Sequence, residues 1–180
     1  MSALRSVRVL PYNPSWPAAF VAVRQALATL LGPAARTIHH VGSTAVPGLV
    51  AKPVLDVLVE TPSLGLIDEA TPDLVERGYE ARGEYGIEGR RYFSRAAAPG
   101  LKLHLHAFES GHERIAKHLR FRDYLLAHPE EAARYARLKQ ELAIRYANDR
   151  DAYQEGKAAF IAEVQARAAA SSGLEPPTTP

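Results

Sequence analysis

A turn of small residues, Gly42-Ser43-Thr44, lies between two predicted strands. Glycine lets the backbone approach a ligand closely, and successive N–H groups together with two hydroxyls can converge on an anion. Gly42, Ser43 and Thr44 are therefore candidates for binding phosphate. A plain structural turn is the alternative, because most Gly-Ser pairs serve only that purpose.

One carboxylate, Asp56, interrupts the apolar run 54–59 downstream of this turn. A carboxylate is costly to bury unless it meets a cation, a hydrogen-bond donor or water. Asp56 is thus a candidate for holding a divalent metal such as Mg²⁺ or Mn²⁺, since hard cations prefer carboxylate oxygen. Pairing with Lys52 is the structural alternative, and Lys52 is also a candidate phosphate ligand.

Two histidines share a face of a later predicted strand, LKLHLHAF over 101–108. Strand alternation puts His104 and His106 on one side with Lys102, and the intervening apolar residues on the other. Two imidazoles on one face can bind metal, pair with phosphate or transfer protons. His104 and His106 are therefore candidates for catalysis and metal binding with Asp56, although histidines on a wet sheet face also occur without such roles.

Several arginines could supply positive charge for a phosphorylated ligand. Arg91 belongs to a cluster whose other members are close in sequence: Arg82, Arg90 and Arg95. This cluster can attract phosphate, or it can protect an edge strand. Arg122, in the run KHLRFRDYLLAHP, can bind phosphate bidentately. We interpret three basic residues of the later helices as solvated or ion-paired: Lys139, Arg150 and Lys157.

Composition limits the classes of protein to which the chain can belong. The chain has 180 residues, 47% of them hydrophobic, which suits one domain over 1–170 and a Pro-, Ser- and Thr-containing tail, expected to be disordered, over 171–180. The lack of cysteine excludes disulfides, thiolate zinc sites and a cysteine nucleophile. A formal charge of +2 without a basic stripe does not indicate nucleic-acid binding. Without a bilayer-spanning run or a signal-peptide pattern, we expect no membrane association and a cytoplasmic location.

Hydrophobic periodicity predicts the elements that position these residues. An amphipathic helix is expected from Ser15 to about Gly32, followed by strands over 37–41 and 53–59 and a helix over 64–77. Three extended segments then suggest an antiparallel meander: 79–85, 90–95 and 101–108.

The last part of the chain is helical in pattern from His112 onward. Three helices are expected, divided at His128-Pro129 and at Asn148-Asp149, where Asp149 can cap the third. The predicted fold is α/β (α+β), a mixed sheet of about five strands with an N-terminal helix packed on it and three C-terminal helices covering one side.

A resemblance to the GrpB family is carried by four strings across about residues 7–165: HHVGSTAVPGLVAKPVLDVLVE, LHLHAF, HLRFRDYLLAHPEEAARYARLK and DRDAYQEGKAAFI. These small bacterial proteins have the nucleotidyltransferase fold of the DNA polymerase beta-like superfamily. The resemblance implies that Gly42 and Ser43 bind nucleotide phosphates and that Asp56 binds metal. Enzymes of that superfamily hold Mg²⁺ on carboxylates of neighbouring strands, and the metal neutralises the triphosphate during in-line attack.

The chain departs from that superfamily pattern at the second carboxylate, which would fall at Leu58. The third is expected on a neighbouring strand, where the sequence offers His104 and His106. Either histidine replaces an acid, or the chain retains phosphate binding and has lost two-metal catalysis.

Three functions are compatible with these residues. The first is a nucleotidyltransferase-like protein that binds a nucleotide or another phosphorylated small molecule, with nucleotidyl transfer on Mg²⁺ or Mn²⁺ as an open step. The second is a catalytically degenerate binder that acts as an accessory to another enzyme. The third is a metal-dependent hydrolase built on four residues: His40, Asp56, His104 and His106.

Overall fold

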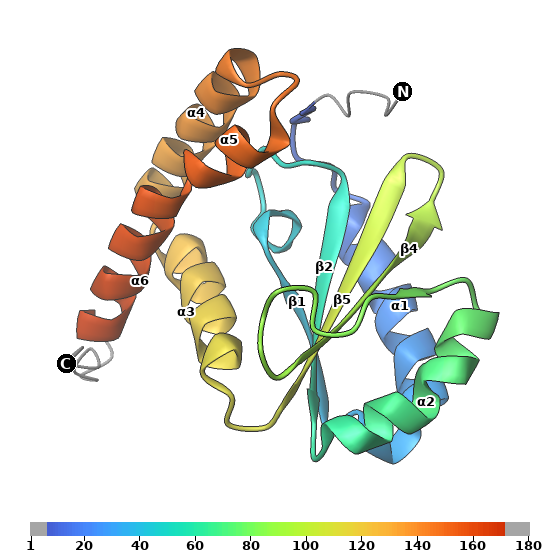
Figure 1. Ribbon diagram of the computed structural model, residues 1–180. Coiled ribbons are helices and arrows are strands. Elements are labelled where there is room, and N and C mark those ends of the chain that lie inside the picture. Colours follow the sequence, from blue (N-terminus) through green and yellow to red (C-terminus); the bar gives the residue numbers. More distant parts are fainter. Residues whose placement is uncertain (1–6, 172–180) are drawn as a thin grey trace.

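A five-stranded mixed sheet organises residues 7–171, the part of the chain that the computed structural model describes (Figure 1). The strands lie in the order β1-β2-β5-β4-β3. β2 and β5 are parallel, and the other neighbours are antiparallel. Their bounds are β1 Thr37–Val41, β2 Val54–Thr61, β3 Glu80–Ala81, β4 Arg90–Ala98 and β5 Leu101–Glu109. The α/β class and the mixed sheet are therefore as the sequence predicts.

The strand expected over 79–85 is much shorter than predicted, because only Glu80 and Ala81 pair with β4. Residues 82–89 form turns instead, and three of them are glycines with positive φ, Gly83, Gly86 and Gly89. Such backbone conformations do not continue a strand. The meander is thus completed by a loop that lies over the sheet next to β4.

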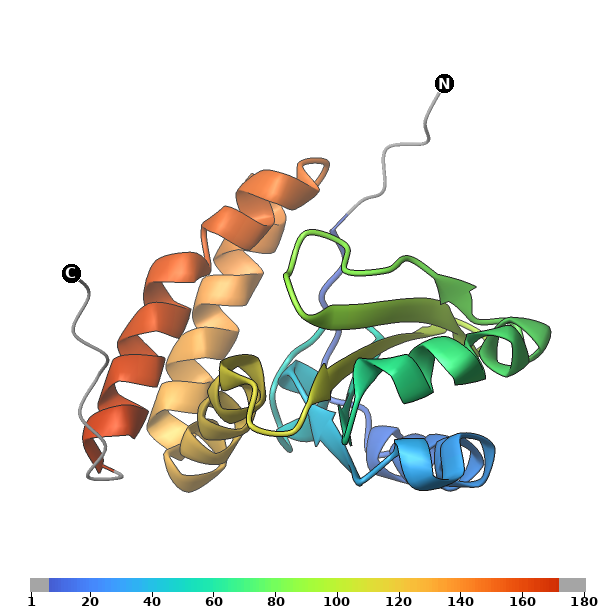
Figure 2. The same cartoon turned by 60° about the horizontal axis from the view of Figure 1, so that its bottom comes forward.

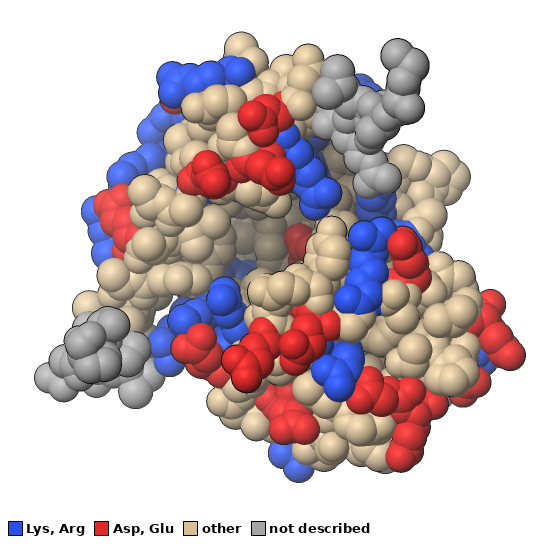
Figure 3. Space-filling model, in the orientation of Figure 1, with Lys and Arg blue, Asp and Glu red and all other residues tan. Residues whose placement is uncertain are grey.

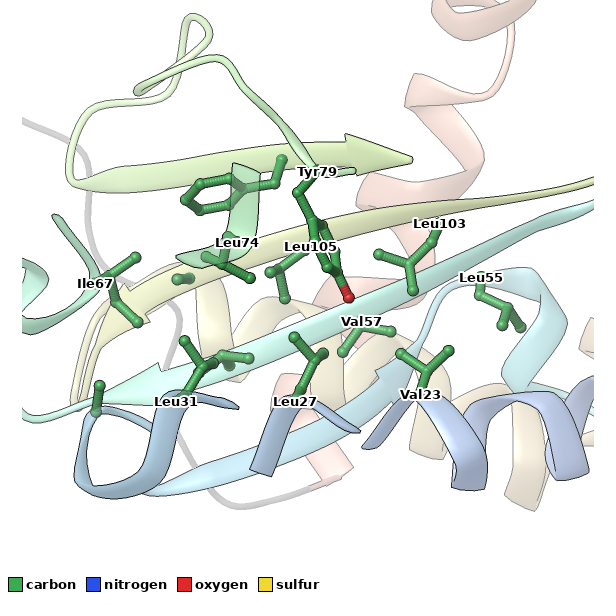
Figure 4. Packing of buried hydrophobic residues seen from close by; sticks show 14 of the residues in the cluster. Val23, Leu27, Leu31, Leu55, Val57, Ile67, Leu74, Tyr79, Leu103 and Leu105 are labelled. Atoms are coloured by element: carbon green, nitrogen blue, oxygen red, sulfur yellow. The ribbon is translucent and has the colours of Figure 1, made fainter. Parts of the chain in front are cut away.

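Two helices cover one face of the sheet, as Figure 2 shows: α1 (Trp16–Leu31) and α2 (Leu64–Glu76). The main core lies between them and the sheet (Figure 4). Leu27 of α1 and Leu74 of α2 meet Val57 of β2 and Leu105 of β5 in this core. Because side chains alternate along a strand, every second residue of β2 and β5 faces this core, and Asp56, His104 and His106 lie on the other face of the sheet.

The C-terminal helices lie on the other side of the molecule: α3 (Glu113–Ala127), α4 (Pro129–Arg145), α5 (Arg150–Glu155) and α6 (Ala158–Ser171). Asp149 caps α5 as predicted, with its carboxylate accepting from Ala152 N–H at 3.0 Å. The third expected helix is divided into α5 and α6 at Gly156. A Cβ at this position would lie 2.5 Å from the end of the Leu142 side chain of α4, so a larger residue would require that side chain to move.

Two smaller cores join the sheet to these helices. Leu58 and Phe108 from the second face of the sheet pack with Ile115 of α3. The segment after the Gly42 turn, which begins with the short 3₁₀ helix η2 (Ser43–Ala45), packs into the helices. Val46 and Leu49 of this segment contribute to a cluster completed by residues of α3, α4 and α6: Leu125, Tyr135, Phe160 and Val164.

The short 3₁₀ helix η1 (Gly32–Ala34) follows α1. Among the helices formed by residues 7–171, none combines the length and the apolar character required to cross a membrane. Of the predicted tail 171–180, Ser171 ends α6, and the rest lies outside the described residues.

Candidate functional site

A cleft of about 790 Å³ opens over the sheet face that α1 and α2 leave uncovered. Side chains of β2, β4 and β5 form its floor, and residues of α4, α5 and the α5–α6 junction line the opposite wall. Figure 3 shows the hollow, with Lys and Arg side chains among those that border it. α3 covers the part of this sheet face around Leu58 and Phe108, and the cleft occupies the rest.

Three polar side chains meet on the floor. Asp56 of β2 is paired in register with His104 of β5, and His106 lies two residues further along the same strand. His104 Nδ1 lies 3.4 Å and His106 Nε2 3.6 Å from the same oxygen of Asp56, Oδ1. Burial raises the pKa of the Asp56 carboxyl, but the contacts from His104 and His106 lower it by more, so its pKa lies well below the usual range. Asp56 is therefore ionised at neutral pH.

Arg90 sets the orientation of His106. Its side chain is only 5% exposed, and its Nη1 lies 3.4 Å from His106 Nδ1. Because a guanidinium can only donate, this contact assigns His106 Nδ1 as the acceptor and leaves the ring proton on Nε2, toward Asp56. Both contacts therefore run the same way: Arg90 donates to His106, and His106 donates to Asp56.

The backbone at Gly42 touches the Asp56 carboxylate. Gly42 has φ 73° and precedes Ser43 at the start of η2. A Cβ at Gly42 would lie 2.6 Å from Asp56 Oδ2, well inside van der Waals contact. Only glycine meets both demands, the positive φ and the close approach.

Ser43 is held by a lysine of α4. Lys139, 2% exposed, donates to Ser43 Oγ at 2.9 Å and to the Val50 carbonyl, and its Nζ lies 4.5 Å from the centroid of the Tyr135 ring. Burial, followed by the charges of Lys157 and Lys52, lowers the pKa of Lys139 to about 7. Since Lys139 donates to the Ser43 oxygen, the Ser43 hydroxyl proton can point to an acceptor, and the Tyr135 side chain lies within hydrogen-bonding reach of it.

Two further lysines meet at Tyr153 of α5. Lys52 Nζ lies 4.8 Å and Lys157 Nζ 4.7 Å from the centre of this buried ring. Burial, and then the charge of Lys52, lowers the pKa of Lys157 to about 8, and burial together with Arg150 lowers that of Lys52. Burial and the neighbouring cations thus both disfavour the charged form of these two lysines.

The cleft as a whole is strongly basic. Among the described residues, eight Lys and Arg side chains line it, but only two acidic ones, Asp56 and Glu80. Glu80 already pairs with Arg82 at 2.7 Å, and Asp56 is held by the two histidines. A cleft of this size with an excess of cations attracts anions, because its field is focused by the surrounding protein.

Comparison with known proteins identifies the family. The family model described as GrpB protein matches residues 6–167. The chain belongs to the GrpB family. It is 38% identical over 157 residues to the UPF0157 protein YqkA of Bacillus subtilis (strain 168), a match that covers 87% of this chain and 46% of YqkA. The chain thus spans less than half of the length of that relative.

One solved structure of the same family agrees with this assignment. The conserved protein GrpB from Enterococcus faecalis is similar over 92% of this chain and 99% of its own, with a TM-score of 0.85 and 34% identity. A more remote match is the Cid1 poly(U) polymerase in its MgATP-bound H336N form, with a TM-score of 0.47 and 12% identity over 73% of this chain and 45% of that chain. The family predicted from the sequence strings is confirmed.

In this GrpB-family chain, most of the predicted site residues lie together. Ser43, Lys52, Asp56, His104 and His106 all line the cleft, and Gly42 packs directly against Asp56. Lys52 is not the closest partner of Asp56, because the two histidines occupy that position.

Thr44 does not reach the cleft. It is 1% exposed, and its hydroxyl donates to the Val54 carbonyl at 3.1 Å and accepts from His40 Nε2 at 3.0 Å. Its hydrogen-bonding capacity is therefore used inside the protein, and the expected role in binding phosphate is replaced by a structural one. His40, which also stacks on Phe20, is likewise occupied and does not join Asp56 as the hydrolase hypothesis required.

The two arginines singled out as phosphate ligands also lie elsewhere. Arg91 forms a bidentate ion pair with Asp68 of α2, at 2.6 and 2.9 Å, because strand alternation directs it to the face opposite that of its neighbour Arg90. Arg122 contacts Asp123 and donates to the His40 carbonyl. Arg90 and two other members of the predicted cluster, Arg82 and Arg95, line the cleft instead.

The interpretation of Lys139 as solvated or ion-paired is wrong, because its side chain is 2% exposed and donates to Ser43 and to the Val50 carbonyl. Lys157 is half-buried and Arg150 exposed, and both line the cleft. The sequence contains a signal for two of them. Lys139 lies four residues after Tyr135 on α4, and Lys157, at the α5–α6 junction, lies four residues after Tyr153, so each lysine follows a buried tyrosine by about one helical turn. A lysine in such a position must be buried with its amine directed to a polar site.

The donor set does not fit the expected Mg²⁺ or Mn²⁺. Leu58, at the position of the second carboxylate, is 0% exposed within an apolar cluster. Among the described residues, Asp56 is then the one carboxylate at the centre of the floor, accompanied by imidazoles, whereas these hard cations prefer oxygen ligands. Within residues 7–171, no group of three or more His, Asp or Glu side chains is arranged to hold a metal ion.

Proposed function

We propose that this chain is a nucleotidyltransferase-like protein that binds a nucleotide or another phosphorylated small molecule in the basic cleft. The observation that carries the proposal is the charge of the cleft, where eight basic side chains of the described residues face two acids that are already paired. Phosphate supplies the missing negative charge and several strong hydrogen-bond acceptors.

The ligand phosphate would lie at Ser43, between the sheet and the lysines of the opposite wall. Ser43 can donate its hydroxyl proton because Lys139 already donates to its oxygen. Lys52 and Lys157, which converge on Tyr153, supply the nearest mobile ammonium groups. An anion placed there would raise the lowered pKa values of these lysines, so binding is coupled to proton uptake.

The residues favour binding over metal-assisted transfer. Asp56 is engaged by two histidines, and Leu58 removes the second carboxylate that a two-metal site requires. The expected role of Asp56, His104 and His106 is therefore to form the polar floor, with Asp56 holding the two imidazole rings in place. No step in this proposal depends on Mg²⁺ or Mn²⁺.

Calorimetric titration with inorganic tripolyphosphate and with each of ATP, GTP, CTP and UTP tests the proposal, in EDTA and again in Mg²⁺. Lys157→Met should weaken binding about tenfold or more, because a charge-assisted hydrogen bond contributes on the order of 1.5–3 kcal/mol. Lys117→Met is the matched control, since this lysine pairs with Glu113 on α3 and does not line the cleft.

Wild-type protein that binds none of these ligands would refute the proposal, as would equal effects of the two lysine substitutions. A labelled nucleoside triphosphate incubated with a metabolite extract separates binding from transfer. Transfer of label that requires Mg²⁺ and is lost in Asp56→Asn would show that metal-dependent catalysis is retained, contrary to a purely structural role for Asp56 in the polar floor.

A further inference from the structure

An exposed tyrosine at the end of the cleft has an unusual backbone. Tyr85, in the loop between β3 and β4, is 55% exposed and lines the cleft. Among residues 7–171 it is the one non-glycine residue with a positive φ, 46°. This conformation costs a residue other than glycine on the order of 1–2 kcal/mol, so it persists only where neighbouring contacts impose it.

Those contacts come from Arg90. Its guanidinium donates to the Glu84 carbonyl at 3.1 Å and to the Tyr85 carbonyl at 2.7 Å. The Glu84 carboxylate in turn accepts from Gly89 N–H at 2.8 Å, which ties the two ends of the loop together. The same arginine orients His106, so the position of Tyr85 is linked to the floor of the cleft.

The Tyr85 ring extends an aromatic surface that begins on the sheet. It stacks on Tyr92 of β4, with 5.1 Å between ring centres and an angle of 9° between ring planes. Tyr92 lies 5.2 Å from the His106 ring, and Arg82 lies over the Tyr85 ring at 5.3 Å. A planar group that enters here meets an aromatic ring already stacked on a second ring, and a guanidinium; both kinds of group bind aromatic rings well.

Strand register sets the spacing between this aromatic surface and Lys102, one of the lysines that line the cleft. Tyr92 is paired with His106, whereas Lys102 at the other end of the cleft lies four residues earlier on β5. At about 3.3 Å per residue, the aromatic and the basic ends are roughly 13 Å apart. Asp56 and His104 lie between the two ends.

We infer that the ligand is a nucleotide whose base stacks on Tyr85 while its phosphates reach the lysines near Ser43. This inference rests on the proposed function and narrows it, because a sugar phosphate or inorganic phosphate would use the basic end alone. Base stacking on an aromatic side chain contributes about 1–3 kcal/mol and tolerates different bases.

The test compares Tyr85→Leu with Tyr85→Phe, using ATP, GTP, CTP, UTP and inorganic tripolyphosphate in calorimetric titrations. Tyr85→Leu should weaken the nucleotides that bind wild-type protein by roughly five- to a hundredfold. It should leave tripolyphosphate affinity within about twofold, since that ligand has no ring to stack. Tyr85→Phe keeps the ring and should bind nucleotides as wild type does.

Four results would overturn the inference. Wild-type protein that binds tripolyphosphate but no nucleoside triphosphate would refute the stacking site and leave the basic cleft intact as a phosphate site. Tyr85→Leu that weakens tripolyphosphate and nucleotides equally, or that weakens neither, would also refute it. Wild-type protein that binds none of the five ligands would refute the proposed function, and the stacking site with it.

Discussion

Gly42 lies against the carboxylate of Asp56 so closely that a Cβ on Gly42 would be 2.6 Å from Oδ2. The turn that holds Ser43 and the carboxylate that orients the two histidines are therefore packed as one unit. A change in either residue must move the other.

Gly42→Ala should destabilise the protein more than Gly48→Ala does. Both glycines have positive φ, 73° and 77°, but a Cβ at Gly48 meets no atom within 4 Å. The backbone cost, on the order of 1–2 kcal/mol, is thus shared, whereas the clash with Asp56 adds about 1–3 kcal/mol at Gly42 alone. Urea denaturation gives the two free energies of unfolding. Equal values would show that the Asp56 side chain can move away from a Cβ at position 42 without loss of stability.

Lys139 should make the stability of the ligand-free protein depend on alkaline pH. Burial lowers its pKa from 10.5 to about 7, so between these values the unfolded state holds a proton that the folded state lacks. The free energy of unfolding should then rise with pH across this window, by about 1.4 kcal/mol per pH unit from this group. Lys139→Met should reduce that slope, and Lys117→Met should not. Identical slopes in both variants would show that Lys139 titrates normally.

Two buried histidines should destabilise the protein in mild acid. Burial lowers the pKa of His40 and of His118 from 6.5 to about 4, with the charges of Arg122 and His106 as further causes. As pH falls from about 6.5 to about 4, the two histidines bind protons in the unfolded state but not in the folded state, so the free energy of unfolding decreases. His118→Phe should lessen this loss, as measured by urea midpoints between pH 4 and 7. An unchanged pH profile would contradict the assignment of His118 as neutral.

The sheet core should be sensitive to single cavities. Leu105 is buried between β5 and the helices α1 and α2, whereas Ile144 of α4 is 82% exposed. Leu105→Ala should cost about 2–5 kcal/mol of the free energy of unfolding, and Ile144→Ala less than about 0.5 kcal/mol. Thermal and urea unfolding of both variants provide the measurement. Similar losses in the free energy of unfolding would show that Leu105 does not belong to the core that stabilises the fold.

Alternation along strands makes much of the floor predictable. Because apolar residues alternate with them, His104 and His106 are expected on the polar face of their strand, and the structure places both beside Asp56. The sequence strings that resemble the GrpB family independently predict Gly42, Ser43 and Asp56 as site residues. Local patterns of this kind depend on one element at a time, which is why the sequence reveals them.

The wall of the cleft depends on packing that no local pattern encodes. Residue type alone assigns Lys139 and Lys157 to solvent, although their helical spacing from Tyr135 and Tyr153 points inward. A choice between Arg90 and Arg91 requires knowing which face of β4 lies over the cleft. That knowledge comes from the relative placement of sheet and helices, which arises from contacts between residues far apart in the chain.

The segment that follows Ser43 is anchored at both ends in different parts of the molecule. Gly42 is wedged beside Asp56 on the sheet, and Val46 and Leu49 insert among the C-terminal helices. A rotation of those helices about the sheet would therefore be transmitted to Ser43 and change its distance from the carboxylate. The turn thus fixes the position of Ser43 relative to both the sheet and the C-terminal helices, which form opposite sides of the cleft.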